Sequence, residues 1–352
     1  MLLVAIVAMA QWHLSEYALT PGDATPVGPL VRIDGVVSET HHGTIMLTDV
    51  YLESLTAWRW FQLQFSSHVE FISASQLVEP GVPTDELVAQ GYLEMSDSKQ
   101  GAEVSAFRAL GWQVPSRPTG VIVNAVVNPS PARTAHLHVA DEIVAVNGRA
   151  VRSVCSMIAA VHDVAPKTLV RLSVDRATIS SKGVITWRPT STVRVVTAPA
   201  PTDLGLSGCA GVSGSGRSWI GVALEDGVHY ALPAKVSINT ADIGGPSAGL
   251  AMTLTLIDKM SRSSITGGQP IAATGTIDVN GNVGDVGGVA EKTVAVQRGG
   301  AKYFIVPQVE VSTAEHAASA GLRIIGVTTL AQALNDLRAI GGARPVPLTA
   351  PR

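Results

Sequence analysis

The sequence lacks several features that mark common protein classes. Its 25 Lys and Arg against 28 Asp and Glu leave a formal net charge of −3, and it has no basic run, so a nucleic-acid partner is not indicated. Two cysteines, Cys155 and Cys209, cannot define a disulfide framework and lack metal-ligand spacing, so the redox compartment stays open and no metal is expected. No G-x-x-x-x-G-K-[ST] loop occurs, so no ATPase module is encoded and no cofactor is expected.

Long hydrophobic runs are also absent. The first ten residues, MLLVAIVAMA, are apolar but fall short of the about 20 residues that a spanning helix needs, and they lack the basic start of a signal peptide. One interpretation is a buried strand or helix start. The other, which we favour, is the end of a membrane anchor over residues 1–16 whose beginning lies upstream of Met1. Trp12 and Tyr17 would then be interfacial aromatics.

The composition indicates several folded modules. Hydrophobic residues make up 46% of the chain, enough for sizeable cores, and 34 Gly and 20 Pro supply turns and linkers between them. We therefore expect a multidomain α/β (α+β) protein. Residues 17–106 are predicted to be a mainly-β region with a helix over 84–111, and they carry no recognisable chemistry.

Residues 107–197 form a second predicted module. The strand VIVNAVV is followed by the turn NPSPA, the string DEIVAVNG, a helix over 153–164 and the strand LVRLSVDR. This order resembles a β-rich PDZ domain of the bacterial protease-associated type. The resemblance implies a groove beside the strand 121–127 that accepts an extended peptide by strand addition, with binding residues Gly120, Val121, Ile122 and Val123.

Two residues of this module depart from the PDZ pattern. His136 and Ala140 stand where that family usually carries turn glycines. A residue other than glycine takes a positive φ only at a cost, so the approach to the groove is expected to be reshaped. The alternative is a PDZ fold that serves only as a spacer.

A Pro/Gly/Ser-rich linker over 198–218 precedes the segment that carries chemistry, residues 219–340, and a frayed tail follows over 341–352. The string GGPSAG comes directly before an apolar helix. Pro246 suits the first helical position, which puts Ser247 in the first turn, where free N–H groups converge. A hydroxyl there can attack a carbonyl whose oxyanion faces those donors, although most serines at helix starts are caps.

A second helix is predicted over 289–298. Its periodicity places Lys292 on an apolar face with Val289 and Val296, and Glu291 on the opposite face. Burial lowers the pKa of a lysine and so makes its neutral amine a general base. The alternative is a lysine whose stem is buried and whose ammonium reaches water. Ser247 and Lys292 are together a candidate Ser-Lys dyad for acyl transfer.

The strings GGPSAG, TGTIDVNGNVGDVGG before Lys292, and GGAKYFIVP resemble the proteolytic domain of Lon-type serine proteases. This resemblance implies a layered α/β domain in which Ser247 is the nucleophile and Lys292 the general base. It also implies that Thr274 helps to orient the amine. The motif glycines and proline are supporting residues, namely Gly245, Pro246, Gly287 and Gly288. Gly244 and Asp285 depart from the family pattern, which leaves the resting geometry open.

The order of a PDZ domain and a Lon-like domain without an ATPase resembles the YlbL-like bacterial proteins. The resemblance implies membrane association through the N-terminus and a catalytic part outside the cytoplasm. We therefore expect an ATP-independent serine endopeptidase that cleaves polypeptides, forms a homo-oligomer like many Lon-type enzymes, and recruits or gates substrates with its PDZ domain.

Two other functions were weighed against this one. The first is a catalytically silent PDZ scaffold or regulatory peptide-binding protein at the membrane, against which both dyad residues argue. The second is a His-Asp-Ser protease, but Ser247 lacks the G-x-S-x-G context, and neither His229 nor His316 sits in a triad pattern.

Overall fold

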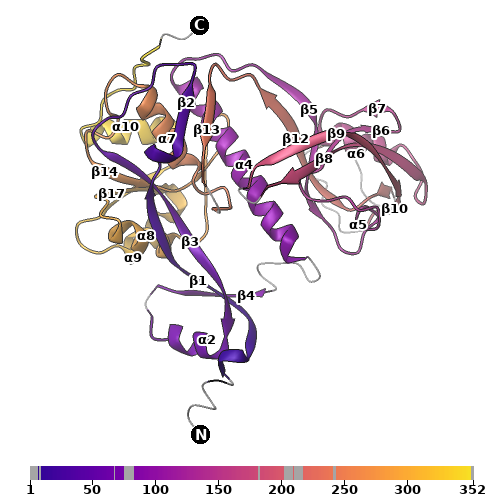
Figure 1. The fold of residues 1–352 in the computed structure, drawn as a ribbon, viewed down its shortest axis with the longest axis horizontal. Helices are drawn as coiled ribbons and strands as arrows, with labels where there is room; N and C mark the ends of the chain where they lie inside the picture. Colours follow the sequence, from indigo (N-terminus) through magenta and orange to yellow (C-terminus); the bar gives the residue numbers. More distant parts are fainter. Residues whose placement is uncertain are drawn as a thin grey trace. The chain divides into compact units, whose positions relative to one another are not determined.

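The computed structural model describes residues 7, 9–66, 68–74, 83–180, 183–201, 209, 217–240 and 243–349. The chain divides into two compact units, and both are discontinuous in sequence (Figure 1). Unit 1 comprises residues 1–80, 97–114 and 232–352, and unit 2 comprises residues 81–96 and 115–231. Unit 2 is thus inserted into unit 1, and the boundary between them falls within the helix α4 (Thr84–Ala109).

Unit 1 is built on a six-stranded mixed sheet. Its strand order is β18-β17-β14-β3-β1-β4, with parallel pairing from β18 to β3 and antiparallel pairing from β3 to β4. The strands are β1 (His13–Pro26), β3 (Thr44–Thr56), β4 (Glu70–Ser73), β14 (Pro270–Ala273), β17 (Tyr303–Pro307) and β18 (Arg323–Val327). Two small antiparallel pairs accompany it: β2 (Val31–Asp34) with β13 (Lys235–Ile238), and β15 (Thr276–Ile277) with β16 (Val283–Gly284).

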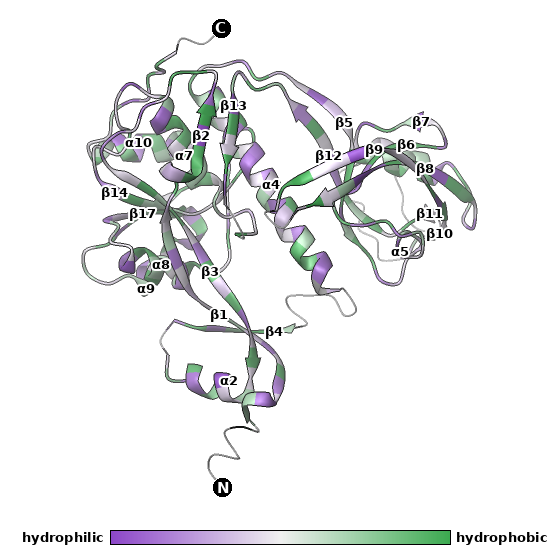
Figure 2. Ribbon diagram, in the orientation of Figure 1, coloured by the Kyte–Doolittle hydropathy of each residue, from purple (hydrophilic) through white to green (hydrophobic). Residues whose placement is uncertain are grey.

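The helices of unit 1 cover this sheet. They are α2 (Ala57–Leu63), the C-terminal part of α4, α7 (Gly249–Met260), α8 (Val289–Arg298), α9 (Val311–Ala317) and α10 (Leu330–Ala339), with short 3-10 turns at Gly28–Leu30 and Gln308–Glu310. Both hydrophobic and hydrophilic residues occur along α4 (Figure 2). Ten of the twelve residues of α7 are buried, because this helix packs among the sheet, β15 and α4.

Unit 2 is a second sheet with the order β12-β5-β6-β8-β9. Its strands are β5 (Ser116–Val126), β6 (Glu142–Val146), β8 (Leu169–Ile179), β9 (Ile185–Val196) and β12 (Val222–Tyr230), with the short pieces β7 (Arg149–Ala150), β10 (Ala198–Pro199) and β11 (Ser218–Trp219). Its helices are α5 (Pro131–Thr134) and α6 (Val154–His162). The core is rich in valine, from Val121 on β5 to Val195 on β9. His136 and Ala140 take positive φ values of 56° and 70°, as glycines would at those turns.

The predicted domain boundaries are wrong in two places. Residues 17–106 are not a separate domain, because β3 pairs in parallel with β14 and so completes the sheet that supports the site. Residues 222–230 do not open the last module, because β12 pairs along its length with β5 of unit 2. Both errors have the same cause. The alternation of apolar and polar residues predicts a strand, but it does not predict which other strand pairs with it.

The two ends of the chain also differ from expectation. Residues 13–16 belong to β1, so they are not part of an anchor; most of residues 1–8 lie outside the described residues. No helix among the described residues has the length and apolar character to cross a membrane. The predicted frayed tail is bound as far as Thr349: Arg262 N–H donates to the Val346 carbonyl (2.9 Å), and Leu348 N–H donates to the Met260 carbonyl (2.8 Å). Most of the predicted linker over 198–218 lies outside the described residues.

Candidate active site and peptide-binding edge

Ser247 lies in a tight turn before α7. The helix begins at Gly249 with Ala248 as its N-cap, so Ser247 precedes the first helical turn instead of lying in it. Gly245 has φ +84°, a conformation that glycine takes readily and that lets the chain turn sharply ahead of Pro246. Ser247 is half-buried, and both flanking departures from the Lon pattern, Gly244 and Asp285, are exposed.

The main chain of this turn is held from β14 and its following residues. The Ser247 carbonyl accepts two hydrogen bonds, from Gly275 N–H (2.9 Å) and from the Thr274 hydroxyl (3.2 Å). Leu250 N–H in turn donates to the Gly275 carbonyl (3.1 Å). Thr274 is fully buried, so its hydroxyl is a fixed donor in a dry environment. Thr274 therefore fixes the backbone that carries the serine.

Lys292 lies on α8, four residues after the helix N-cap Gly288. Its exposed fraction is 3%, which excludes the alternative in which the ammonium reaches water. Burial lowers the pKa of Lys292 to about 8, against the opposing effect of three carboxylates, Glu310, Asp49 and Glu291. An amine with this pKa is substantially neutral near pH 8 and can accept a proton.

The Gly287-Gly288 pair sets the start of α8. Gly288 has φ +67°, and a Cβ there would lie 2.9 Å from Val50 Cγ1 of β3. Only glycine lets the helix start so close to that strand without strain. Gly287 has open space where its Cβ would lie, so the close approach is confined to Gly288.

The prediction that Glu291 faces away from the apolar side of α8 is wrong. Glu291 is buried beside Lys292, because α8 packs against β1 and β3 on one side and against α9 on another. Burial raises the pKa of Glu291, and the Glu70 carboxylate raises it further. A helix covered on more than one side buries residues that a single-face periodicity assigns to solvent.

The structure does not join the two candidate catalytic side chains. In the part of the chain that it describes, no hydrogen bond links the Ser247 hydroxyl to the Lys292 amine. The same described residues contain no group of three or more His, Cys, Asp or Glu side chains that could hold a metal ion. The site thus offers a hydroxyl, a buried amine and backbone donors as its chemical groups.

Two contributors to the site were missed from the sequence. Ser98 on α4 is buried, and its hydroxyl donates to the Pro246 carbonyl (2.9 Å). Asp49 on β3 acts on Lys292 electrostatically and accepts from Asp23 N–H (2.7 Å). Gly22 leaves the space for this carboxylate, because a Cβ there would lie within van der Waals overlap of Asp49 Oδ1. Both residues lie more than a hundred positions before Ser247, and no local motif marks them.

The structure contradicts the predicted peptide groove beside residues 120–123. Both edges of β5 are occupied: β12 pairs with one edge from Ser116 to Val126, and β6 pairs with the other at Val121 and Ile122. Gly120 lies opposite Gly227 of β12, so its edge on that side is occupied. The outer strand is β12, whose second edge meets no other strand among the described residues.

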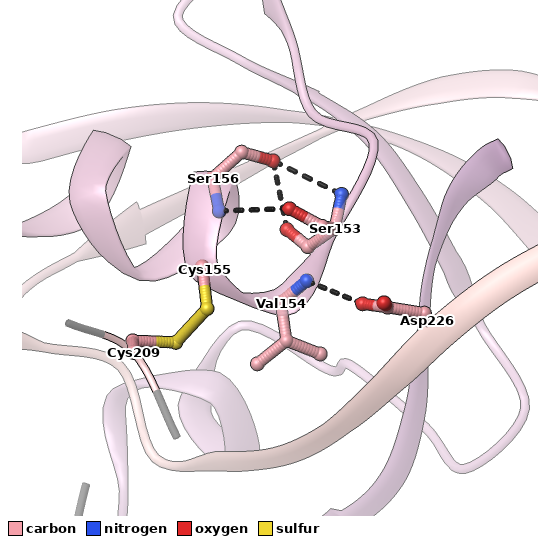
Figure 3. Close-up of a disulfide and its surroundings, with 6 residues drawn as sticks. All are labelled: Ser153, Val154, Cys155, Ser156, Cys209 and Asp226. Atoms are coloured by element: carbon pink, nitrogen blue, oxygen red, sulfur yellow. Dashed lines mark hydrogen bonds between the residues drawn. A yellow bond between two sulfur atoms is a disulfide. The ribbon is translucent and has the colours of Figure 1, made fainter. Parts of the chain in front are cut away.

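The helix α6 packs near this outer strand. Asp226 of β12 accepts a hydrogen bond from Val154 N–H at the start of α6 (2.6 Å), as Figure 3 shows. Ser153 and Ser156 cap the same helix end reciprocally: Ser156 N–H donates to Ser153 Oγ, and Ser153 N–H donates to Ser156 Oγ. The helix α6 thus lies beside the outer strand β12.

A disulfide joins Cys155 on α6 to Cys209 (Figure 3). The sequence did not predict this disulfide, because two cysteines 54 residues apart carry no pairing pattern. Disulfides persist mainly in oxidising compartments.

Two family models match this chain, one for a proteolytic domain and one for a PDZ domain. A family model for the Lon protease (S16) C-terminal proteolytic domain matches residues 227–337, and a PDZ domain model matches residues 108–182. Among curated relatives, a Lon protease from Treponema pallidum is 40% identical over 67 residues, which is 19% of this chain and 7% of that protein. A Lon protease from Rickettsia bellii is 30% identical over 117 residues, which is 32% of this chain and 15% of that protein.

The chain therefore spans only a small part of the curated relatives that it matches. Among solved structures, the PDZ domain of the SdrC-like protein from Listeria monocytogenes is similar at 19% identity and a TM-score of 0.23, covering 30% of this chain and 87% of that one. Together with the turn at Ser247, the buried Lys292 and the six-stranded sheet of unit 2, the two family models identify a Lon-type serine protease domain and a PDZ domain in this chain.

Proposed function

We propose that this protein is a serine endopeptidase in which Ser247 is the nucleophile and Lys292 the general base. The observation that carries the proposal is the burial of Lys292, which lowers its pKa to about 8 inside a Lon-type proteolytic domain. The neutral amine takes the Ser247 proton as Oγ attacks the peptide carbonyl carbon. The amine then returns that proton to the leaving nitrogen, and water hydrolyses the acyl-enzyme by the same steps in turn.

Backbone geometry supports stabilisation of the oxyanion. The N–H groups of Ser247 and Ala248 donate no hydrogen bond within the described residues, so they are free to bind a developing negative charge. Thr274 and Gly275 hold the carbonyl of the same residue and so keep this turn in place. The dyad itself requires the Lys292 amine to approach Ser247, which a bound substrate that displaces water would favour.

We propose further that cleavage needs no nucleotide, because the sequence contains no Walker-type loop. The test measures hydrolysis of casein and of fluorogenic peptides without nucleotide, by the parent protein, Ser247→Ala, Lys292→Ala and Lys292→Arg. We expect all three variants to lose at least about 1000-fold in kcat, since the two residues act as a unit.

The matched control is Lys302→Ala, because Lys302 is exposed and its amine bonds only to Gln269 among the described residues. This variant is expected to cleave like the parent. Hydrolysis that survives in Lys292→Ala would refute the dyad, and strict dependence on ATP would refute nucleotide independence. Absence of any Ser247-dependent cleavage across a peptide library would leave the silent scaffold as the better function.

For the PDZ domain, we propose that it recruits polypeptide substrates by adding their extended segments to the outer edge of β12. Backbone pairing of this kind tolerates many sequences, which suits a protease with varied substrates. The Cys155–Cys209 disulfide supports placement of this unit in an oxidising compartment, outside the cytoplasm. We also propose that the protein associates with a membrane through the apolar residues 1–10. We propose in addition that it forms a homo-oligomer, which a measurement of its sedimentation tests.

A further inference from the structure

An exposed aromatic cluster lies in unit 1 and has no part in the proposed catalysis. The chain has only six Trp and five Phe, yet three of the Trp and two of the Phe gather at one place. We call this set the aromatic tip; it comprises Trp12, Trp58, Trp60, Phe61 and Phe65. Their exposed fractions reach 79% at Phe65, 68% at Trp12, 45% at Phe61 and 37% at Trp60. Soluble surfaces rarely gather so many large apolar side chains.

The tip is an ordered structure. The helix α2 is capped by Thr56, whose hydroxyl accepts from Arg59 N–H (3.2 Å), and Ala57 N–H donates to the Trp12 carbonyl (2.9 Å). Below it, Ala18, Leu55 and Leu63 form a small buried core. The rings also contact one another: the centroids of Trp58 and Phe61 are 6.0 Å apart, and those of Phe61 and Phe65 are 5.3 Å apart.

The tip also stands apart from the candidate active site. Asp49, whose carboxylate acts electrostatically on Lys292, lies on β3, and this strand ends at Thr56, the N-cap of α2. Seven residues of extended chain separate these two points, which corresponds to roughly 23 Å. Figure 1 shows α2 at the far end of the β1–β3 ribbon from α8 and α9. An occupant of the tip would therefore leave the catalytic turn accessible.

The charge at the tip is close to neutral. From Thr56 to Val69 the only Asp, Glu, Lys or Arg is Arg59, and its guanidinium is paired with Glu53 through two hydrogen bonds of 2.9 Å. Residues 1–15 contain no Asp, Glu, Lys or Arg. A protein or nucleic-acid partner bound by charge is therefore disfavoured here, and an apolar or interfacial partner is favoured.

The chain that leads into the tip has the same character. The apolar run of residues 1–10 precedes Trp12 in the sequence, and most of this run lies outside the described residues. Trp12 is the first aromatic residue after it. Tryptophan is enriched at membrane–water interfaces because its ring is amphipathic, and phenylalanine inserts below it. A lipid surface that received residues 1–10 would therefore lie close to Trp12, the residue of the tip that follows this run in the sequence.

We propose that the aromatic tip inserts into the interface of a lipid bilayer as a second membrane contact, beside residues 1–10. The tip binds zwitterionic lipid through its rings, without a requirement for anionic headgroups. Two contacts fix the orientation of unit 1 at the membrane, which a single contact does not do.

The test uses the full chain with phosphatidylcholine vesicles and measures the bound fraction by co-sedimentation. Phe61→Ser with Phe65→Ser, which leaves residues 1–10 intact, is expected to weaken vesicle partitioning by about tenfold or more. The matched control is Val309→Ser with Val196→Ser, since these two apolar residues are also exposed but lie outside the tip. This control is expected to bind like the parent. Circular dichroism and thermal unfolding confirm that all variants are folded.

Two further measurements make the proposal specific. Brominated phosphatidylcholine is expected to quench the tryptophan fluorescence of the parent and to quench the Phe61→Ser with Phe65→Ser variant less. Added phosphatidylglycerol or high salt is expected to change binding less than twofold, because the tip is close to neutral. Equal partitioning of the parent and that variant would overturn the proposal. A parent dimer in the absence of lipid that the same substitutions convert to a monomer would overturn it in favour of a second copy of this chain.

Discussion

At the residue scale, the candidate chemistry depends on Lys292. Its burial lowers the pKa, whereas Glu310, Asp49 and Glu291 raise it, and the result of about 8 lies far below the ordinary lysine value. Asp49 lies on β3, Glu310 lies in the 3-10 turn Gln308–Glu310, and Glu291 is next to Lys292 on α8. The pKa of the amine therefore depends on how these elements pack together.

The pH dependence of cleavage follows from this value. Because the base must be neutral, kcat/KM is expected to rise with pH and to level off above about pH 8. Asp49→Asn removes a carboxylate that raises the pKa of Lys292, so the rising limb should move to lower pH. Asp34→Asn is the control, because Asp34 pairs with Arg32 on the exposed strand β2. A pH–rate profile that is the same for all three proteins would contradict the role of Asp49.

Ser98 is a second residue-scale case, as a positioning residue for the nucleophile turn. Ser98→Ala leaves the Pro246 carbonyl without this donor, and we expect kcat to fall by about tenfold with little change in KM. Ser105→Ala is the matched control on the same helix, since the Ser105 hydroxyl bonds to Ala102 and Thr253 instead. Equal kinetic losses in both variants would indicate a general packing effect instead of positioning.

At the scale of elements, the helix α6 is held by three different devices. Ser153 and Ser156 cap its N-terminus, Asp226 of β12 accepts from Val154 N–H, and Cys155 carries the disulfide to Cys209. Of these contacts, the Asp226 hydrogen bond joins α6 to the outer strand of unit 2. The disulfide is the only covalent one, and it closes a loop of 54 residues.

Removal of the disulfide is expected to destabilise unit 2 selectively. Loop-closure entropy alone gives about 4 kcal/mol for a loop of this length. Cys155→Ser with Cys209→Ser should therefore raise hydrogen exchange in β8, β9 and α6, while α7 and α8 of unit 1 keep their protection. A reducing agent should reproduce this effect in the parent and leave the variant unchanged. Equal deprotection of both units would show that they do not unfold independently.

At the scale of the whole molecule, the insertion of unit 2 into unit 1 is the main architectural feature. The two ends of the longer segment of unit 2, residues 115–231, lie side by side, since Ser116 pairs with Tyr230 and Ala231 N–H donates to the Pro115 carbonyl (2.9 Å). A domain with adjacent ends can be inserted or removed with little effect on the chain that surrounds it.

Excision of residues 116–230 with a short glycine linker tests this arrangement. Leu93 is buried against Val139 and Ala140 in the parent, so it is changed to Gln in the same variant, in which the excision removes these partners and would expose it. We expect cleavage of short peptides to remain within about threefold of the parent, and cleavage of casein to fall, since recruitment through β12 is lost. Unchanged turnover of casein would show that the PDZ domain recruits no substrate.

The sequence by itself determined the parts that local chemistry specifies. The helix over 289–298 was predicted at its observed bounds, because glycines directly precede and follow it. Ser247 and Lys292 were singled out from their local sequence context, and Thr274 from the resemblance to Lon-type proteases. Their identity lies in short strings whose residue types and spacing are legible without a structure.

Only the tertiary structure decided which strands pair and what surrounds the lysine. The pairing of β3 with β14 joins segments more than two hundred residues apart, and the pairing of β12 with β5 places that strand in unit 2. The same packing buries Glu291 and brings Asp49 and Ser98 to the site. Alternation and periodicity report that a face is apolar, but the partner that covers it is chosen by the free energy of the whole packed chain, to which residues far apart in sequence contribute equally.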